Sequence, residues 1–171
     1  MATAGVRVEP GNFAELVRAH QGMVFSIAYH FLRDRPAAEE VAQDVFLQLY
    51  RSLRDLHGDA HLTFWLRKVT SHRCIDRVRK RKLQASVTLE DASELSVSGE
   101  HGDPLLNRRV RALLTSLPEK PRMVMILRYQ EDLMPEEIAQ ILEMPVSTVK
   151  SHLQRSLAML REKIGRTVGS T

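Results

Sequence analysis

The segment "MPVSTVKSHLQRSLAML" (144–160) decides the fold, because its apolar and polar side chains fall on opposite sides of a helix. The apolar positions recur every three or four residues, at Val146, Val149, Leu153, Leu157 and Leu160. The opposite side carries cationic and hydrogen-bonding groups, at Lys150, Ser151, His152, Gln154 and Arg155. Such a helix packs one side on a core and presents the other side to solvent or to a ligand.

A second helical pattern, "PEEIAQIL" (135–142), lies directly upstream, and "EMP" (143–145) separates the two. Pro135 and the acids that follow it favour the start of a helix, and the small Ala139 allows a close helix crossing. In a helix-turn-helix the second helix enters the major groove, where Lys and Arg bind guanine or phosphate and Gln pairs with adenine. We therefore predict a DNA-binding helix-turn-helix. The plainer alternative is a helical hairpin with a solvated outer face.

The amino-terminal part also has helical period, first over 13–32 and then over "AAEEVAQDVFLQLYRSL" (37–53). The second of these helices is apolar on more than one face, because Phe46, Leu47 and Tyr50 widen its apolar stripe. Such a helix is either buried on two sides or buried once and offered to a partner.

Residues 58–82 begin as an apolar helix and end as a strongly basic one. The apolar phase slips at 70–73, which predicts a kink or a short loop there. Residues 67–82 contain eight Lys or Arg and one acid, Asp76. A run of this kind is typical of salt-sensitive binding to nucleic acid, because each neutralised phosphate releases counterions.

Charge also divides the chain into three parts. Residues 83–104 contain five acids and no Lys or Arg, whereas 1–82 and 105–171 are both basic. The acidic segment has little period and is rich in Ser and Gly, which predicts a flexible linker. We predict an all-α fold of two small helical domains, 10–82 and 105–166, joined by the flexible acidic linker 83–104. The second domain ends in the helix-turn-helix.

Other classes of protein are excluded by what the sequence lacks. The single Cys74 permits no internal disulfide, and no apolar run approaches the roughly 20 residues of a membrane span. His57 and His61 have no third ligand at a recognisable spacing, so we predict no metal, and no cofactor. No acid–base or nucleophilic cluster is apparent, so we predict a protein that is not an enzyme. With no apolar signal core at the amino terminus, we expect a cytoplasmic protein without membrane insertion.

Four segments together resemble a known family in their order and spacing. They are "AEEVAQDVFLQLYRSL" (38–53), "FWLRKVTSHRCIDRVRKRK" (64–82), "SLPEKPRMVMILRYQEDLMPEEIAQIL" (116–142) and "MPVSTVKSHLQRSLAMLREKI" (144–164). The chain resembles the bacterial sigma factors of the extracytoplasmic-function type, within the sigma-70 family. The resemblance implies an alternative sigma factor, a promoter-specificity subunit that directs transcription initiation by RNA polymerase. It also implies that 10–82 is sigma region 2 and that 105–166 is sigma region 4.

The resemblance further implies partners and contact residues. Core polymerase would bind through its β′ clamp helices and β flap, promoter DNA would bind at two elements, and an anti-sigma factor is a further expected partner. The expected core-polymerase contacts are Glu40, Gln43, Asp44, Phe46 and Leu47. The expected −10 contacts are Arg67, Lys68, Ser71, His72, Arg73 and Arg77, with a short loop at 71–73 that captures a flipped base. The expected −35 contacts are Ser147, Thr148, Lys150, Ser151, His152, Gln154 and Arg155.

Three other readings remain open from the residues alone. A stand-alone helix-turn-helix transcription regulator would fit the carboxy-terminal half, although 10–82 has no strand period for a receiver domain. A small helical enzyme would need the acid–base or metal cluster that the sequence lacks. A structural nucleoid protein would bind DNA without polymerase and with little promoter preference. Binding to duplex DNA without polymerase separates the regulator and the nucleoid protein from a sigma factor.

Overall fold

The structure is a computed structural model that describes residues 10–87 and 104–168, and these residues form two compact helical units. The predicted all-α class is confirmed for the described residues, whose regular elements are helices. In the described ranges, no helix is both long enough and apolar enough to cross a membrane.

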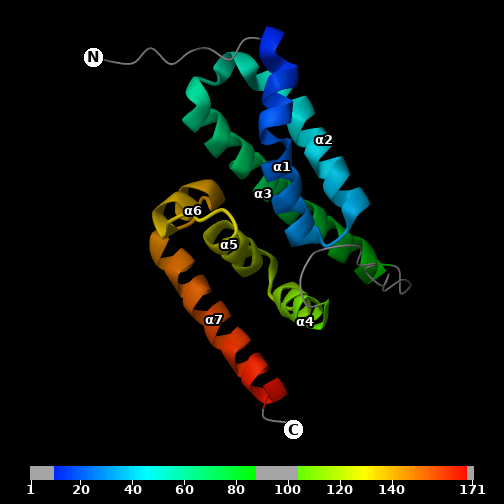
Figure 1. The fold of residues 1–171 in the computed structure, drawn as a ribbon, viewed down its shortest axis with the longest axis vertical. Helices are drawn as coiled ribbons and strands as arrows, with labels where there is room; N and C mark the ends of the chain where they lie inside the picture. Colours follow the sequence, from blue (N-terminus) through cyan, green and yellow to red (C-terminus); the bar gives the residue numbers. More distant parts are fainter. Residues whose placement is uncertain (1–9, 88–103, 169–171) are drawn as a thin grey trace. The chain divides into compact units, whose positions relative to one another are not determined.

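The first unit packs three α-helices on one another (Figure 1). Its elements are η1 (Pro10–Asn12), α1 (Phe13–Leu32), α2 (Arg35–Ser52), η2 (Leu53–Asp55) and α3 (Gly58–Val87). The core is continuous across all three helices, because residues from each are fully or almost fully buried. They include Val24, Ile27 and Phe31 of α1, Val41, Val45 and Leu49 of α2, and Leu62, Leu66 and Cys74 of α3.

The turn between α1 and α2 is set by local chemistry. Arg33 adopts a left-handed conformation with φ 56°, and its N–H donates to the Tyr29 carbonyl over 2.8 Å, which ends α1. Asp34 then caps α2, because its Oδ1 accepts from the Ala37 N–H over 3.1 Å. Pro36 occupies the first turn, where its missing N–H is not needed.

Of the kink or short loop expected at 70–73, the loop is wrong, because α3 is helical without a break from Gly58 to Val87. The phase slip arises where two hydroxyl residues occupy core positions. Thr70 and Ser71 are both fully buried, and the Thr70 hydroxyl donates to the Leu66 carbonyl of its own helix over 2.6 Å. A small polar residue satisfied by its own helix thus replaces an apolar one, and the helix continues.

The segment expected to be a flexible linker is partly helical. Residues 83–87 continue α3, where Leu, Gln and Ala favour helix, and Pro104 begins α4. The remainder of the expected linker, 88–103, lies outside the described residues.

The second unit contains α4 (Pro104–Thr115), α5 (Glu119–Tyr129), α6 (Pro135–Leu142) and α7 (Val146–Val168) (Figure 1). Helices α5, α6 and α7 pack on one another. The three-residue turn predicted at 143–145 is confirmed. Glu143 has a left-handed φ of 55°, which ends α6, and Val149 of α7 is fully buried in the core of the unit.

Candidate functional site

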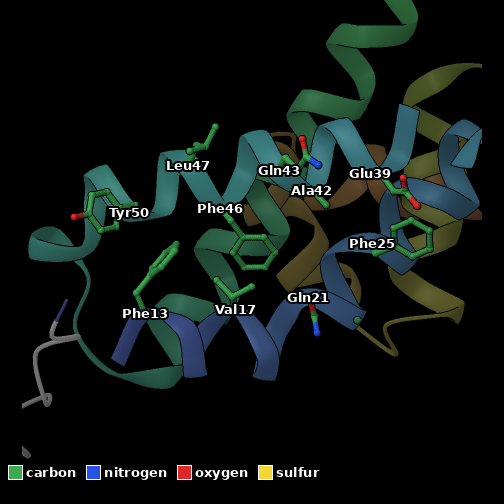
Figure 2. Close-up of a pocket in the computed structure, with 11 residues that line it drawn as sticks. Phe13, Val17, Gln21, Phe25, Glu39, Ala42, Gln43, Phe46, Leu47 and Tyr50 are labelled. Carbon is green, nitrogen blue, oxygen red and sulfur yellow. The ribbon is translucent and has the colours of Figure 1, made fainter. Parts of the chain in front are cut away.

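An open groove of about 990 Å³ runs between α1 and α2 on the first unit (Figure 2). Phe13, Val17 and Phe46 point toward one another across it, from α1 on one side and α2 on the other. At one end Phe13 meets Tyr50 in an edge-to-face contact, with ring centroids 5.3 Å apart. Leu47 and Tyr50 on the α2 rim are each 59 % exposed, which is unusual for large apolar side chains.

The structure divides the five expected polymerase contacts between two sides of α2. Gln43, Phe46 and Leu47 line the groove, although Phe46 is only 9 % exposed and is partly a core residue. Glu40 and Asp44 are exposed on the side of α2 that faces α3. The five residues therefore form one surface in which an apolar side borders an acidic side.

The acidic side of α2 is paired with arginines of α3. Arg77 Nη2 donates to Glu40 Oε2 over 2.7 Å. One turn earlier on α3, Arg73 donates twice to Gln48 Oε1, over 2.7 and 3.2 Å, and lies 3.7 Å from Asp44. One turn later, Arg81 lies 3.4 Å from Asp34. These three contacts, at Arg73, Arg77 and Arg81, are called the ion-pair ladder below.

The expected −10 residues all lie on α3, but in different settings. Arg67, Lys68 and His72 are half-buried, and Arg73 and Arg77 belong to the ion-pair ladder. The prediction that Ser71 contacts DNA is wrong, because Ser71 is fully buried. Its Oγ has no hydrogen-bond partner among the described residues. A side chain in that position does not reach a DNA base.

The expected base-capturing loop at 71–73 also needs correction, because these residues are helical. A non-helical step between α2 and α3 does exist, where η2 (Leu53–Asp55) is followed by the extended Leu56 and by His57. Leu56 is buried and anchors this segment, whereas Arg54 and His57 are exposed. The α2–α3 connection thus has an anchored centre and accessible polar neighbours.

The expected −35 residues lie along the first part of α7, which begins at Val146. Because Val149 and Ser156 are buried, the opposite side of α7 faces outward. Of the expected contacts, Ser147, Lys150, Gln154 and Arg155 are exposed, and Thr148, Ser151 and His152 are half-buried. The arrangement presents amide, hydroxyl and cationic donors on one surface, as major-groove recognition requires.

Electrostatics differ along the two edges of this surface. Lys150 Nζ lies 4.0 Å from Glu136 Oε1 at the start of α6, with both side chains exposed. On the other edge, partial burial lowers the pKa of His152, and the nearby cations Arg155 and Lys120 lower it further. The neutral imidazole is therefore favoured at position 152, where it donates or accepts a hydrogen bond without adding charge.

Other candidate groups have structural roles. Cys74 is fully buried, and burial raises the pKa of its thiol to about 12, so the side chain is a small buried hydrophobe and not a nucleophile. Within 10–87 and 104–168, no three His, Cys, Asp or Glu side chains are grouped to hold a metal ion.

Two features were missed from the sequence. The α1 wall of the groove, with Phe13, Val17 and Phe25, was not predicted to be part of a binding surface. Its signal was the presence of four aromatic residues on one helix. The pairing of α3 with α2 was also missed, although acids four residues apart on α2 and arginines four apart on α3 were visible.

Both units match known protein families. The Sigma-70 region 2 family matches residues 16–84, which cover most of the first unit. The Sigma-70, region 4 family matches residues 107–160, which include the helix-turn-helix. The RNA polymerase sigma-E factor of Streptomyces avermitilis is 32 % identical over 155 residues, covering 90 % of this chain and 85 % of the relative. The chain belongs to the extracytoplasmic-function sigma factors of the sigma-70 family.

Further relatives and solved structures agree with this assignment. The ECF RNA polymerase sigma factor SigW of Bacillus subtilis is 28 % identical over 165 residues, covering 89 % of this sigma factor and 88 % of the relative. The sigma factor RpoE of Bartonella quintana, solved with the anti-sigma factor NepR, matches with a TM-score of 0.77 at 17 % identity, covering 90 % of this sigma factor and 97 % of that chain. CnrH, solved with the cytosolic domain of CnrY, matches with a TM-score of 0.66 at 21 % identity, covering 92 % and 90 %. At these identities the two structures establish the fold alone.

Membership of the family gives the broad activity. This sigma factor is a non-enzymatic, alternative specificity subunit that directs transcription initiation by RNA polymerase. The match of region 2 as well as region 4 accounts for both units, whereas a stand-alone helix-turn-helix regulator would account only for the second.

Proposed function

We propose that the two units divide promoter recognition between them, the first binding core polymerase and the −10 element and the second binding the −35 element. The observation that carries this proposal is the contrast between their outer surfaces. The first unit has an apolar groove with an acidic border on α2 and a basic helix α3 beside it. The second unit has an outward polar face on its recognition helix α7.

Core polymerase binds α2 in this proposal. Leu47 is 59 % exposed beside the groove, and Gln43 lies one turn before it on the same rim. Glu40 and Asp44 add negative charge next to this rim. An apolar centre with charges at its border is the usual anatomy of a protein–protein interface. We propose the β′ clamp helices as the partner here, and the β flap as the partner of the second unit.

The −10 element is read along α3 and at the connection that precedes it. The candidate contacts are Arg67, Lys68, His72, Arg73 and Arg77, and Ser71 is not among them. A flipped base needs a binding site outside a regular helix. We therefore propose that the α2–α3 connection, and not 71–73, captures the base. Arg54 and His57 are the candidate contacts there. Extruding a base costs a few kcal/mol of lost stacking, which such a site offsets only for the right sequence.

The −35 element is read as duplex by α7. Gln154 and Arg155 are exposed on the outward face and suit adenine and guanine, respectively. Ser147 and Thr148, in the first turn, are placed to bind phosphate together with the helix N-terminus. Lys150 and Ser151 complete the polar surface.

Regulation by an anti-sigma factor is a further part of the proposal. One structural neighbour was solved with the anti-sigma factor NepR, and the other with the cytosolic domain of CnrY. We propose that an anti-sigma factor covers the α1–α2 groove and so excludes polymerase. Because it would act together with RNA polymerase on promoter DNA, we also propose that this sigma factor is cytoplasmic.

The test is reconstitution with purified core polymerase. We expect the chain to co-purify with the core enzyme and to support transcription in vitro from a library of promoter templates. The selected templates should share two elements, and scrambling either element should reduce transcription. Promoter-selective binding to duplex DNA by the chain alone, with no transcription after core is added, would refute the proposal in favour of a regulator.

A further inference from the structure

The ion-pair ladder joins two helices that are far apart in the sequence. On α3 the three arginines follow one another at intervals of four residues, at Arg73, Arg77 and Arg81. Their acidic partners on and before α2 follow in the reverse order, at Asp44, Glu40 and Asp34. The two helices therefore run antiparallel along this edge. Along α3, successive arginines of the ladder are one helical turn apart.

The ladder is open to solvent and does not hold the unit together. The Arg77 and Glu40 side chains are 35 % and 61 % exposed, and the other two contacts are also partly exposed. Exposed ion pairs contribute little to stability and exchange readily with other ions. The packing of α2 on α3 rests instead on buried apolar residues such as Val45 and Leu66. Opening the ladder therefore leaves the fold in place.

The ladder brings together two sets of residues with different proposed partners. Glu40 and Asp44 are proposed to bind polymerase, and Arg73 and Arg77 are proposed to bind −10 DNA. A guanidinium beside a carboxylate is less available to a phosphate, because the carboxylate cancels much of its charge. Arg77 also donates to Glu40, whereas Arg73 donates to Gln48 and is paired with Asp44 only through charge, over 3.7 Å. The same two contacts therefore decide how much positive charge α3 presents to DNA.

We infer that the ladder is an electrostatic switch in which Glu40 and Asp44 mask Arg77 and Arg73 until polymerase binding draws the acids away. This inference rests on the proposed function of both surfaces. In the free chain, the acids on α2 act as an internal substitute for DNA phosphate. When core polymerase engages the acidic border of the groove, the two arginines become available, so DNA affinity rises only in the holoenzyme.

The switch concerns only part of the basic surface. Arg79 and Lys80 lie on the exposed part of α3 and belong to no ion pair recorded for the described residues. They give the free chain a basal, unselective affinity for nucleic acid. The masked arginines add to that basal affinity, which makes a gain of binding measurable without polymerase.

The experiment compares the full chain with the double variant Glu40→Gln/Asp44→Asn in the absence of polymerase. Binding to a single-stranded −10 oligonucleotide is measured by fluorescence anisotropy over a series of salt concentrations. The charge-matched control is Glu39→Gln/Asp59→Asn, because Glu39 pairs with Arg35 on its own helix and Asp59 lies in the first turn of α3. We expect the test variant to bind at least about threefold more tightly than the control, with a salt dependence steeper by about 0.7 for each released arginine.

A second pair of variants separates the switch from the proposed function. Adding Arg73→Ala/Arg77→Ala to the test variant should abolish its gain. In reconstituted holoenzyme, Arg73→Ala/Arg77→Ala alone should reduce −10-dependent transcription. If Arg73→Ala/Arg77→Ala reduces transcription but Glu40→Gln/Asp44→Asn gains no DNA affinity, the switch is overturned and the DNA role of the arginines stands. Unchanged transcription overturns both the DNA role of the arginines and the switch.

Discussion

Arg77 Nη2 of α3 donates to Glu40 Oε2 of α2 over 2.7 Å, joining residues that lie 37 positions apart in the chain. Neither residue is buried, so the contact contributes no more than about 1 kcal/mol to the stability of the first unit. The contact matters because of the two helices that it joins. It links the helix proposed to bind polymerase to the helix proposed to bind DNA, so a change of charge on one surface changes the electrostatic potential at the other.

Reversal of charge at Asp44 should separate binding from folding. In Asp44→Arg the new cation faces Arg73, yet both positions are partly exposed, so the free energy of unfolding should fall by less than about 1 kcal/mol. Binding to core polymerase should be lost, because the acidic border of the groove is reversed. Co-purification with core enzyme and urea unfolding measure the two effects. Glu15→Arg on α1 is the control, and unchanged co-purification of Asp44→Arg would count against α2 as the docking helix.

Truncation of Leu47 tests the apolar part of the same surface. Leu47→Ala removes a side chain that is 59 % exposed, so stability should change by no more than about 0.5 kcal/mol. Affinity for core polymerase should nevertheless fall, by about tenfold if Leu47 is a central contact. The matched control is Leu83→Ala on α3, where the leucine is 69 % exposed and away from the groove. Equal affinities of the two variants would remove Leu47 from the interface.

Much of the second unit could be predicted from the sequence, because its signals are local. The apolar period of 144–160, the turn at 143–145 and Pro135 at the start of α6 each act within a few residues. Ala139 and Val149 are buried as expected. Hydrophobic periodicity was sufficient to predict these helices, since one face of each helix packs on the core and the other meets solvent.

The first unit was predicted less well, because its decisive contacts are long-range. The kink or short loop expected at 70–73 came from counting apolar residues only. The structure shows that Thr70 fills a core position by bonding to its own helix, so a polar residue did not mean an exposed one. The ion pair between Arg77 and Glu40 depends on which side of α3 faces α2, and no local pattern specifies that.

A buried arginine stabilises the second unit. Arg122 is 9 % exposed and donates through Nη2 to the carbonyls of Thr115 and Leu117, over 3.0 and 2.9 Å, which holds the end of α4 against α5. Arg122→Met keeps much of the volume but leaves both carbonyls without this donor, and should lower the free energy of unfolding by about 1–3 kcal/mol. Urea unfolding of the full chain measures the loss. The exposed neighbour variant Lys120→Met should differ from wild type by less than about 0.5 kcal/mol, and an equal loss in both would contradict the bonding role.

The imidazole of His152 should titrate below its ordinary value. Partial burial, Arg155 and Lys120 all lower its pKa, so the folded unit binds this proton less readily than the unfolded chain does. The contribution of His152 to stability therefore rises with pH up to about 6.5, the unfolded value, and is constant above it. An NMR titration should place the midpoint of His152 below 6.5, and Lys120→Gln should move it upward. A midpoint at or above 6.5 in the wild type would show that the cations do not act on this ring.

Arg155 tests whether α7 reads bases or merely attracts DNA. Its side chain is exposed on the outward face, two turns after the start of the helix. If Arg155 binds a guanine in the −35 element, Arg155→Ala should cost about 1–3 kcal/mol on matched promoters and relax the preference for that base. The control is Arg161→Ala, an exposed arginine further along the same helix, which removes the same charge. Transcription by reconstituted holoenzyme is compared on templates with an intact or a scrambled −35 element. Only Arg155→Ala should narrow the difference in transcription between the intact and the scrambled template. An equal loss of transcription on both templates would mean that Arg155 contacts the phosphate backbone.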